Sequence, residues 1–362
     1  MFSDEYRVNY YTKNAAKYID VRLDQDVGEI EQDTIIATNI SSLIAFKKDE
    51  PLREKTPFWS ETTYIDDIIK YFALIDDTSF SRQEPEGFSL PLRLLNTCIP
   101  SASLSEASAS HLYIAMANVG FYALFGDSSE YADFESGITI FSKVRPIGAE
   151  TRTVLLKLQC SRHYGMLPSI SEIDLPYEQK SPKLFWRGIS TGCNFRHNMR
   201  DLAVTKFQRH PNPNIDIKFN MLVQEVSGDY VMGDWRNIED QLKCKYLLSI
   251  EGNDVATNLK WIMLSNSVCI MPLPRICSWF MEDHLIPYVH FVPVSEDFSD
   301  LEEVYEWCLD HDAECEEISK NATEFAKQFL DLEREDEITR KVIATYFGLA
   351  NQKKDPSLHI CD

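Results

Sequence analysis

The chain has 362 residues, of which 44% are hydrophobic and 12% aromatic, so it is long enough for two well-filled globular domains. Its formal net charge of −21 disfavours binding to nucleic acids and to anionic membranes, because both present negative phosphates. We therefore expect no nucleic-acid partner.

Cysteine usage and the N-terminal sequence bear on the compartment. The nine cysteines include no CxxC pair, and their odd number fits reduced thiols better than a disulfide framework or a zinc site. The first residues lack the apolar core of a signal peptide, and no apolar run approaches the ~18 residues of a membrane span. We therefore expect a soluble, cytoplasmic protein without a transmembrane segment.

The first half of the chain gives scattered structural signals. Residues 62–75 have the spacing of an amphipathic helix, residues 111–125 form a nearly continuous apolar element, and residues 136–144 have a strand pattern. A further apolar stretch covers residues 153–160. Prolines and a glycine between Arg162 and Pro182 indicate a linker, so we place a domain boundary there.

The second half alternates between strands and helices. The predicted strands cover residues 184–186, 215–219, 246–250, 267–271 and 289–294. The predicted helices cover residues 198–208, 255–264, 301–309, 313–329 and 335–347. This alternation predicts an α/β fold with a parallel, doubly wound sheet. We divide the chain into residues 1–170, residues 171–334, and a C-terminal helix and tail over residues 335–362.

The segment Lys245–Met271 has the order strand, glycine turn, helix, strand. Gly252, Asn253 and Asp254 supply the turn chemistry between the first strand and the helix. In a βαβ unit the helix begins beyond the carboxyl end of the first strand, so its N–H groups face the crevice where open sheets bind phosphorylated ligands. A structural turn without a ligand explains this segment at least as well on its own.

The stretch Phe185–Gly192 (FWRGISTG) runs from an apolar strand into a loop with two glycines and two hydroxyl groups. It carries Arg187, and Arg196 and Arg200 follow it. Arginine pairs bidentately with phosphate oxygens and keeps its charge, so three arginines near one strand end would suit a diphosphate. Three surface arginines in salt bridges would explain the pattern equally well.

These stretches, together with LIPYVHFVPVSEDFSDLEEVYEW, resemble successive blocks of glycosyltransferase family 90, over roughly residues 141–347. The family includes capsule-associated xylosyltransferases and protein O-glucosyltransferases. The resemblance implies a GT-B fold, in which two Rossmann-like domains face each other across a cleft. Residues 1–170 would bind the acceptor, residues 171–334 would bind the nucleotide sugar, and the C-terminal helix and tail would pack back toward the N-terminal domain.

The resemblance also implies an activity. It predicts inverting transfer of a sugar, xylose or glucose, from a uridine diphosphate (UDP) sugar to a hydroxyl of a glycan or glycoprotein. Neither a cofactor nor a metal ion is expected. The alternative is a non-catalytic nucleotide-sugar-binding or glycan-binding protein on the same fold. A departure from the family pattern at Asn258 favours this alternative, and the arginine block disfavours it.

Carried over by position, the resemblance assigns donor binding to Arg187, Gly188, Thr191, Arg200, Gly252, Asn253, Asn258, Lys260 and His290. Relatives tend to have an arginine or another donor in the helix after the glycine turn, so either Asn258 or Lys260 could contact phosphate here. His290 lies in a predicted apolar strand, where a core histidine is the alternative. Trp186 and Trp279 are expected to serve packing.

The family's general base is an aspartate on a loop shortly before a block that resembles Ile140–Lys143 (IFSK). Asp127 stands at about the right distance, so we predict that its carboxylate takes the proton of the acceptor hydroxyl. Asp133 and the pair Asp76-Asp77 are the weaker candidates. Without the resemblance, a loop aspartate is usually a cap or turn residue.

Overall fold

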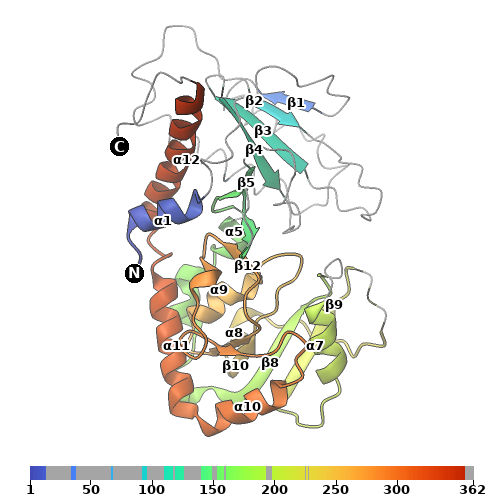
Figure 1. The fold of residues 1–362 in the computed structure, drawn as a ribbon. Helices are drawn as coiled ribbons and strands as arrows, with labels where there is room; N and C mark the ends of the chain where they lie inside the picture. Colours follow the sequence, from blue (N-terminus) through green and yellow to red (C-terminus); the bar gives the residue numbers. More distant parts are fainter. Residues whose placement is uncertain are drawn as a thin grey trace. The chain divides into compact units, whose positions relative to one another are not determined.

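The computed structural model (Figure 1) describes most of the second half of the chain and shorter parts of the first. These are residues 1–13, 34–37, 67, 92–95, 110–116, 119–125, 140–148, 153–158, 160–192, 198–224, 226 and 228–354. The chain divides into two compact units. One consists of Met1 and Ser161–Asp331, and the other combines Phe2–Cys160 with Leu332–Asp362. The helix predicted over residues 62–75 lies almost entirely outside the described residues.

The Ser161–Asp331 unit contains a five-stranded parallel sheet. Its strands in spatial order are β13 (Val292–Pro293), β11 (Val268–Met271), β10 (Cys244–Leu248), β8 (Ser181–Ile189) and β9 (Ile215–Met221). Every pair of neighbouring strands is parallel. The α/β fold with a parallel sheet, predicted from the alternation of elements, is therefore confirmed.

Helices connect the strands, as expected for a doubly wound sheet. The longer ones are α7 (Met199–Phe207), α9 (Thr257–Met263), α10 (Leu301–Asp310) and α11 (Asp312–Lys327). The side chain of Asn198 accepts a hydrogen bond from the Asp201 N–H at 3.1 Å, so α7 begins where an N-cap stands in the sequence. The remaining short elements are α5 (Cys160–His163), Leu167–Ser169, α6 (Ile170–Ile173), Tyr177–Gln179, α8 (Ile238–Gln241), β12 (Ile276–Ser278) and Glu282–His284.

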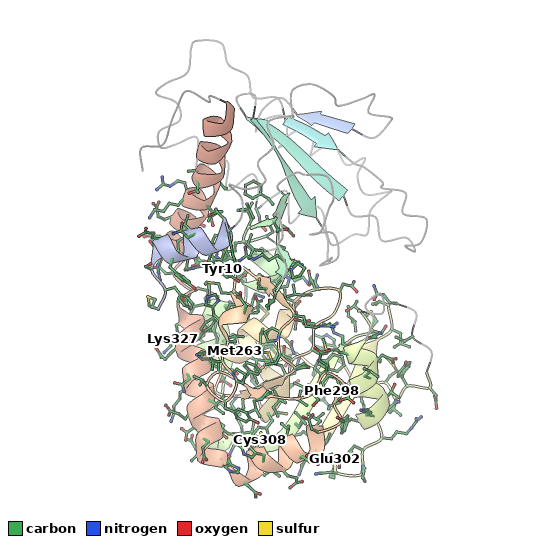
Figure 2. The ribbon with its side chains drawn as sticks, viewed as in Figure 1. Tyr10, Met263, Phe298, Glu302, Cys308 and Lys327 are labelled. Carbon is green, nitrogen blue, oxygen red and sulfur yellow. The ribbon has the colours of Figure 1, made fainter. Side chains whose placement is uncertain are left out.

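Apolar side chains from strands and helices form the core of this unit. Trp186 of β8 and Phe219 of β9 pack edge to face, with ring centroids 5.9 Å apart. Tyr246 of β10 is fully buried and donates a hydrogen bond to the carbonyl oxygen of Cys308 at 3.0 Å. Met263 of α9 and Cys308 of α10 are also fully buried (Figure 2). The buried sheet is thus a rigid support for the loops that follow its strands.

The other unit has a six-stranded sheet. Its strands in spatial order are β1 (Thr34–Ala37), β2 (Leu92–Leu95), β3 (Ser110–Met116), β4 (Val119–Phe125), β5 (Ile140–Ser142) and β7 (Thr153–Leu155). Strands β1 to β4 pair antiparallel, and β4, β5 and β7 pair parallel. The apolar stretch over residues 111–125, expected as one element, is therefore two paired strands. Strand β6 (Val144–Pro146) follows β5.

Two helices from opposite ends of the chain pack together in this unit. They are α1 (Asp4–Tyr11) and α12 (Leu332–Lys354). The buried guanidinium of Arg7 pairs with both carboxylate oxygens of Glu335, at 2.5 and 3.1 Å, and also donates to the Tyr11 hydroxyl. Loss of either partner of this fully buried ion pair would leave an unpaired charge in the core and strongly destabilise the fold. These contacts therefore fix α1 against α12.

Membrane insertion is a separate question. Among the residues that the structure describes, no helix is both long enough and apolar enough to cross a bilayer.

Candidate functional site

The candidate site lies at the carboxyl edge of the parallel sheet in the Ser161–Asp331 unit. Parallel strands place the loops that follow them at one edge, and open α/β sheets bind ligands there. The site is built from three of the loops that follow strands of this sheet: residues 190–192 after β8, residues 249–256 after β10, and residues 272–275 after β11.

Two glycine-containing loops touch each other at this edge. Gly192 has a φ of +100°, and a Cβ atom there would lie 3.1 Å from the Gly252 carbonyl oxygen. A Cβ atom on Gly252 would lie 2.7 Å from the Thr191 hydroxyl oxygen and 2.8 Å from the guanidinium carbon of Arg200. The Gly192 N–H donates to the side-chain oxygen of Asn253 at 2.8 Å. Both positions therefore need glycine, and the contact joins the two predicted motifs.

Arg200 of α7 links the ends of β8 and β10 beneath these loops. Its Nη1 donates to the Ile189 carbonyl at 3.1 Å and to the Thr191 hydroxyl at 2.6 Å. Its Nε and Nη2 donate to the Ile250 carbonyl at 3.2 and 3.1 Å. The guanidinium also lies over the Trp186 ring, 5.9 Å from its centroid. These contacts hold a cation in one place at the edge of the sheet.

The structure thus brings together four of the residues predicted from the sequence: Thr191, Arg200, Gly252 and Asn253. Two further residues of this edge were not predicted. The Gly192 N–H is shared between two acceptors, the side-chain oxygen of Asn253 and that of Gln224, which lies 2.9 Å away. The buried Ser190 hydroxyl accepts from the Val223 N–H at 3.0 Å, so the segment after β9 is tied to the loop after β8. Neither contact has a local sequence signal, because both join segments more than 30 residues apart.

Arg187 is not part of this group of residues. Its guanidinium donates to both carboxylate oxygens of Asp216, each at 2.9 Å, and it stacks 4.4 Å from the Phe185 ring centroid. Asp216 lies opposite Phe185 in the register, so the Arg187 side chain points back along β8, away from the carboxyl edge. Burial alone would raise the pKa of Asp216, but hydrogen bonds from Arg187 and Lys218 hold that pKa below its usual value. In this structure the Arg187 side chain therefore lies apart from the Arg200 group, and its contact with the diphosphate stays a prediction.

Gly188 serves packing within β8. A Cβ atom at this position would lie 2.5 Å from the Trp186 ring, so the absence of a side chain lets the indole lie against the strand. Trp186 and Trp279 are both buried, as expected for packing residues.

Asn258 and Lys260, the two alternatives for phosphate contact, have separate partners. Asn258 donates to the Leu248 carbonyl at 3.0 Å and accepts from the Ser249 hydroxyl at 3.1 Å, so it holds the end of β10. Lys260 is 1% exposed, and its ammonium group lies 3.2 Å from a carboxylate oxygen of Glu282. Neither side chain contacts the two glycine loops through these bonds.

His290 lies in a turn before β13 rather than in a strand, because that strand covers only Val292–Pro293. Residues that precede a parallel strand belong to the amino edge of the sheet, opposite the glycine loops. The ring nitrogen Nδ1 accepts from the Ile286 N–H at 2.9 Å, and the ring packs on Phe325. Burial lowers the pKa of His290. The predicted strand over residues 289–294 is thus shorter than expected, and the contact of His290 with the nucleotide stays a prediction.

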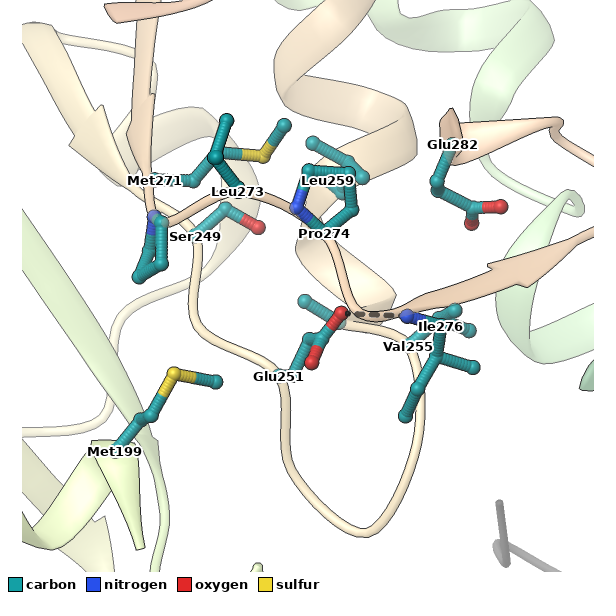
Figure 3. Close-up of a pocket in the computed structure, with 12 residues that line it drawn as sticks. Met199, Ser249, Glu251, Val255, Leu259, Met271, Leu273, Pro274, Ile276 and Glu282 are labelled. Carbon is teal, nitrogen blue, oxygen red and sulfur yellow. Dashed lines mark hydrogen bonds between the residues drawn. The ribbon is translucent and has the colours of Figure 1, made fainter. Parts of the chain in front are cut away.

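A pocket opens beside the glycine loops (Figure 3). It encloses about 330 Å³ together with its open mouth. Its apolar wall includes Met199, Leu259, Met271, Leu273 and Pro274, and two carboxylates, Glu251 and Glu282, also line it. Burial raises the pKa of the Glu251 carboxyl, and contacts with Arg275 and Ile276 offset only part of that rise. The pocket was not predicted from the sequence, because its walls come from the loops after β10 and β11 and from helices α7 and α9, which are separate in the sequence.

The predicted catalytic base lies outside the described residues. This holds for Asp127, for its competitor Asp133 and for the pair Asp76-Asp77. The IFSK block, from which the position of the base was predicted, does lie in the described part of the chain: Ile140–Ser142 forms β5, and Lys143 follows it. The base assignment stays a prediction.

Comparison with known proteins gives the family. The model of Glycosyl transferase family 90 matches residues 163–357. O-glucosyltransferase LpsA of Dichelobacter nodosus is 36% identical over 271 residues, which are 75% of this chain and 75% of that protein.

Two more distant relatives share shorter segments. Protein O-glucosyltransferase 2 of Danio rerio is 28% identical over 163 residues, 42% of this chain and 30% of that protein. Uncharacterized protein 179R of Invertebrate iridescent virus 6 is 28% identical over 200 residues, 46% of this chain and 17% of that protein. The family resemblance found in the motifs is thereby confirmed: the chain belongs to glycosyl transferase family 90 and is a glycosyltransferase.

Proposed function

We propose that the protein transfers a sugar from a UDP-sugar to a hydroxyl group of a glycan or glycoprotein, with inversion at the anomeric carbon. The observation that carries this proposal is the group of Thr191, Arg200, Gly252 and Asn253 at the carboxyl edge of the sheet, beside a pocket. Two relatives are named O-glucosyltransferases, which favours glucose over xylose as the transferred sugar.

The diphosphate of the donor would lie over the two glycine loops. Glycine leaves the backbone of both loops open to close approach by a ligand. Arg200 is already fixed by hydrogen bonds to Ile189, Thr191 and Ile250, so its charge needs no reorganisation when negative charge develops on the departing diphosphate. A preorganised cation of this kind can act without a metal ion, and we propose a metal-independent reaction without a cofactor.

The nucleoside of the donor would occupy the pocket. Its apolar wall, from Met199, Leu259 and Met271 among others, suits a flat base. The described residues that line the pocket include no cationic side chain that would attract a phosphate, so we place the neutral part of the donor in the pocket and the anionic part over the glycine loops. This division uses the donor's own charge distribution to orient it.

The acceptor hydroxyl would be activated by Asp127. The oxygen attacks the anomeric carbon, the bond from that carbon to the diphosphate oxygen breaks, and the hydroxyl proton passes to the Asp127 carboxylate. The proposal includes a GT-B arrangement, in which residues 1–170 bind the acceptor and residues 171–334 bind the donor. We also propose a cytoplasmic location, which rests on the cysteine usage alone.

A donor panel tests the proposal. The protein is incubated with UDP-, guanosine diphosphate (GDP)- and cytidine diphosphate sugars, and slow hydrolysis of the donor is followed with and without EDTA. We expect hydrolysis of UDP-glucose or UDP-xylose, unchanged by EDTA. Hydrolysis of only guanosine or cytidine donors would overturn the UDP assignment. A complete loss with EDTA that manganese restores would overturn metal independence.

A further inference from the structure

Glu251 connects two of the three loops at the edge of the sheet. It lies between Ile250, whose carbonyl binds Arg200, and Gly252, which packs on Arg200. Its carboxylate faces the segment Pro272–Ile276, which follows β11 and is named the wall segment below. Figure 3 shows this carboxylate reaching the backbone of the wall segment.

Three hydrogen bonds make the connection. Oε1 of Glu251 accepts from the backbone N–H of Arg275 at 2.9 Å and from that of Ile276 at 3.3 Å. Oε2 accepts from Nε of Arg275 at 3.1 Å. Two donors fill both acceptor positions of Oε1, and the Glu251 side chain is only 12% exposed. The carboxylate is therefore committed to the wall segment.

The wall segment depends on such an anchor because of its sequence. Pro272 and Pro274 have no backbone N–H, so they cannot donate to a neighbouring strand. Leu273 between them is 57% exposed, which means that its side chain is not held in the core. Pro272, Leu273, Pro274 and Ile276 nevertheless line the pocket. The two N–H groups that fix the end of this segment are those bound by Glu251.

We propose that Glu251 is a positioning residue that holds the wall segment against the donor pocket, and that the width set in this way selects the nucleobase. This inference rests on the proposed function, because it takes the pocket as the nucleoside site. Glu251 would act on donor affinity and base discrimination through the wall segment, without taking part in the transfer.

Three variants separate the bonds. Glu251→Ala removes all three and leaves two part-buried N–H groups without their acceptor. Glu251→Gln keeps an oxygen for the two backbone N–H groups but turns an NH₂ group toward Nε of Arg275. Arg275→Ala is the matched control, because it removes only the side-chain bond, and the Arg275 side chain is 31% exposed.

The experiment measures UDP and GDP affinity by calorimetry, and kcat and KM for hydrolysis of the UDP-sugar. For Glu251→Ala we expect KM to rise about 10- to 100-fold, as for loss of a buried acceptor, with kcat within about threefold of the unmodified enzyme. The preference for UDP over GDP should fall, since a released wall admits the larger purine. Glu251→Gln should give a smaller shift in the same direction, and Arg275→Ala should stay within about threefold.

The outcomes separate the two proposals. If the unmodified protein binds UDP and Glu251→Ala keeps both its KM and its base preference, the positioning role is overturned. A fall in kcat at constant KM would also overturn it. If Glu251→Ala does not fold, Glu251→Gln decides by the same criteria. If the unmodified protein binds no uridine nucleotide, the proposed function fails and the inference fails with it.

Discussion

The two arginines of the sequence block around FWRGISTG lie in contrasting surroundings. Arg187 lies within β8, two residues before its carboxyl end, and its guanidinium faces the carboxylate of Asp216 on the neighbouring strand. Arg200 is at the start of α7, and it donates to the carbonyls of Ile189 and Ile250 and to the Thr191 hydroxyl. One arginine fastens two strands along their length, and the other fastens two strand ends beneath the glycine loops.

The difference shows what decides the role of a cation in a parallel sheet. A residue within a strand reaches sideways to its neighbour, and Arg187 finds Asp216 because the register brings Phe185 and Asp216 opposite each other. A residue in the first turn of the following helix stands at the carboxyl edge, where the connecting loops bind ligands. Position relative to the strand end therefore decides which of the two arginines lies among the loops that we propose for donor binding.

The largest expected effect comes from a residue outside both regions. Asp127→Asn should lower turnover by about 10²–10⁴-fold, because a general base lowers the activation barrier of the transfer step. The same variant should keep its UDP affinity, in contrast to a variant of a donor-binding residue. Calorimetry with UDP and the rate of sugar transfer or donor hydrolysis measure the two quantities. An active Asp127→Asn beside an inactive Asp133→Asn or Asp77→Asn would move the base to that residue.

Lys260, like Arg187, is a cation that pairs with a carboxylate away from the glycine loops. Lys260→Ala leaves the Glu282 carboxylate buried without its ammonium partner, although Ser278 still donates to it at 2.6 and 2.7 Å. We expect the free energy of unfolding in urea to fall by about 3–4 kcal/mol, close to the cost of breaking a buried ion pair.

The double variant Lys260→Met, Glu282→Gln is the control for Lys260. It should recover much of the loss, since no buried charge is left unpaired. Unchanged stability of Lys260→Ala together with weaker UDP binding would instead assign Lys260 to the phosphate.

The arginine comparison itself is tested by a pair of variants. Arg200→Ala should weaken UDP binding by about 1.5–3 kcal/mol, the range for a hydrogen bond to a charged group. Arg187→Ala should leave UDP affinity nearly unchanged and lower the unfolding free energy, because Asp216 then keeps only its lysine neighbours, of which Lys218 is 3.0 Å away. Equal losses of UDP affinity in both variants would return Arg187 to the diphosphate.

Local sequence patterns predicted the unit from β10 to β11 and the glycine turn between them, because strand, turn and helix signals all lie within one continuous segment. They did not predict the partner of Arg187, since Asp216 is 29 residues away and its approach depends on strand register. The pocket was missed for the same reason: Glu251 and the wall segment meet only when β10 and β11 are paired. The strand predicted over residues 289–294 was too long, because only Val292–Pro293 pairs with β11 and His290 lies in the turn before it.

His290 gives the smallest expected effect, and it probes the amino edge opposite the glycine loops. Its neutral ring accepts a hydrogen bond from the Ile286 N–H, and burial lowers its pKa below the usual value of about 6.5. A depressed histidine pKa favours the folded state most above the unfolded pKa, and that contribution is lost as the pH falls through about 6.5 toward the folded pKa.

The unfolding free energy of the unmodified protein should therefore fall more steeply between about pH 7 and pH 5 than that of His290→Gln. In this variant the amide oxygen can still accept from Ile286, and no proton is taken up. Comparing the two proteins removes the contribution of the other histidines. UDP affinity should be the same in both, because the amino edge is remote from the glycine loops. A His290→Gln variant that keeps the full pH dependence but loses UDP affinity would place His290 at the donor after all.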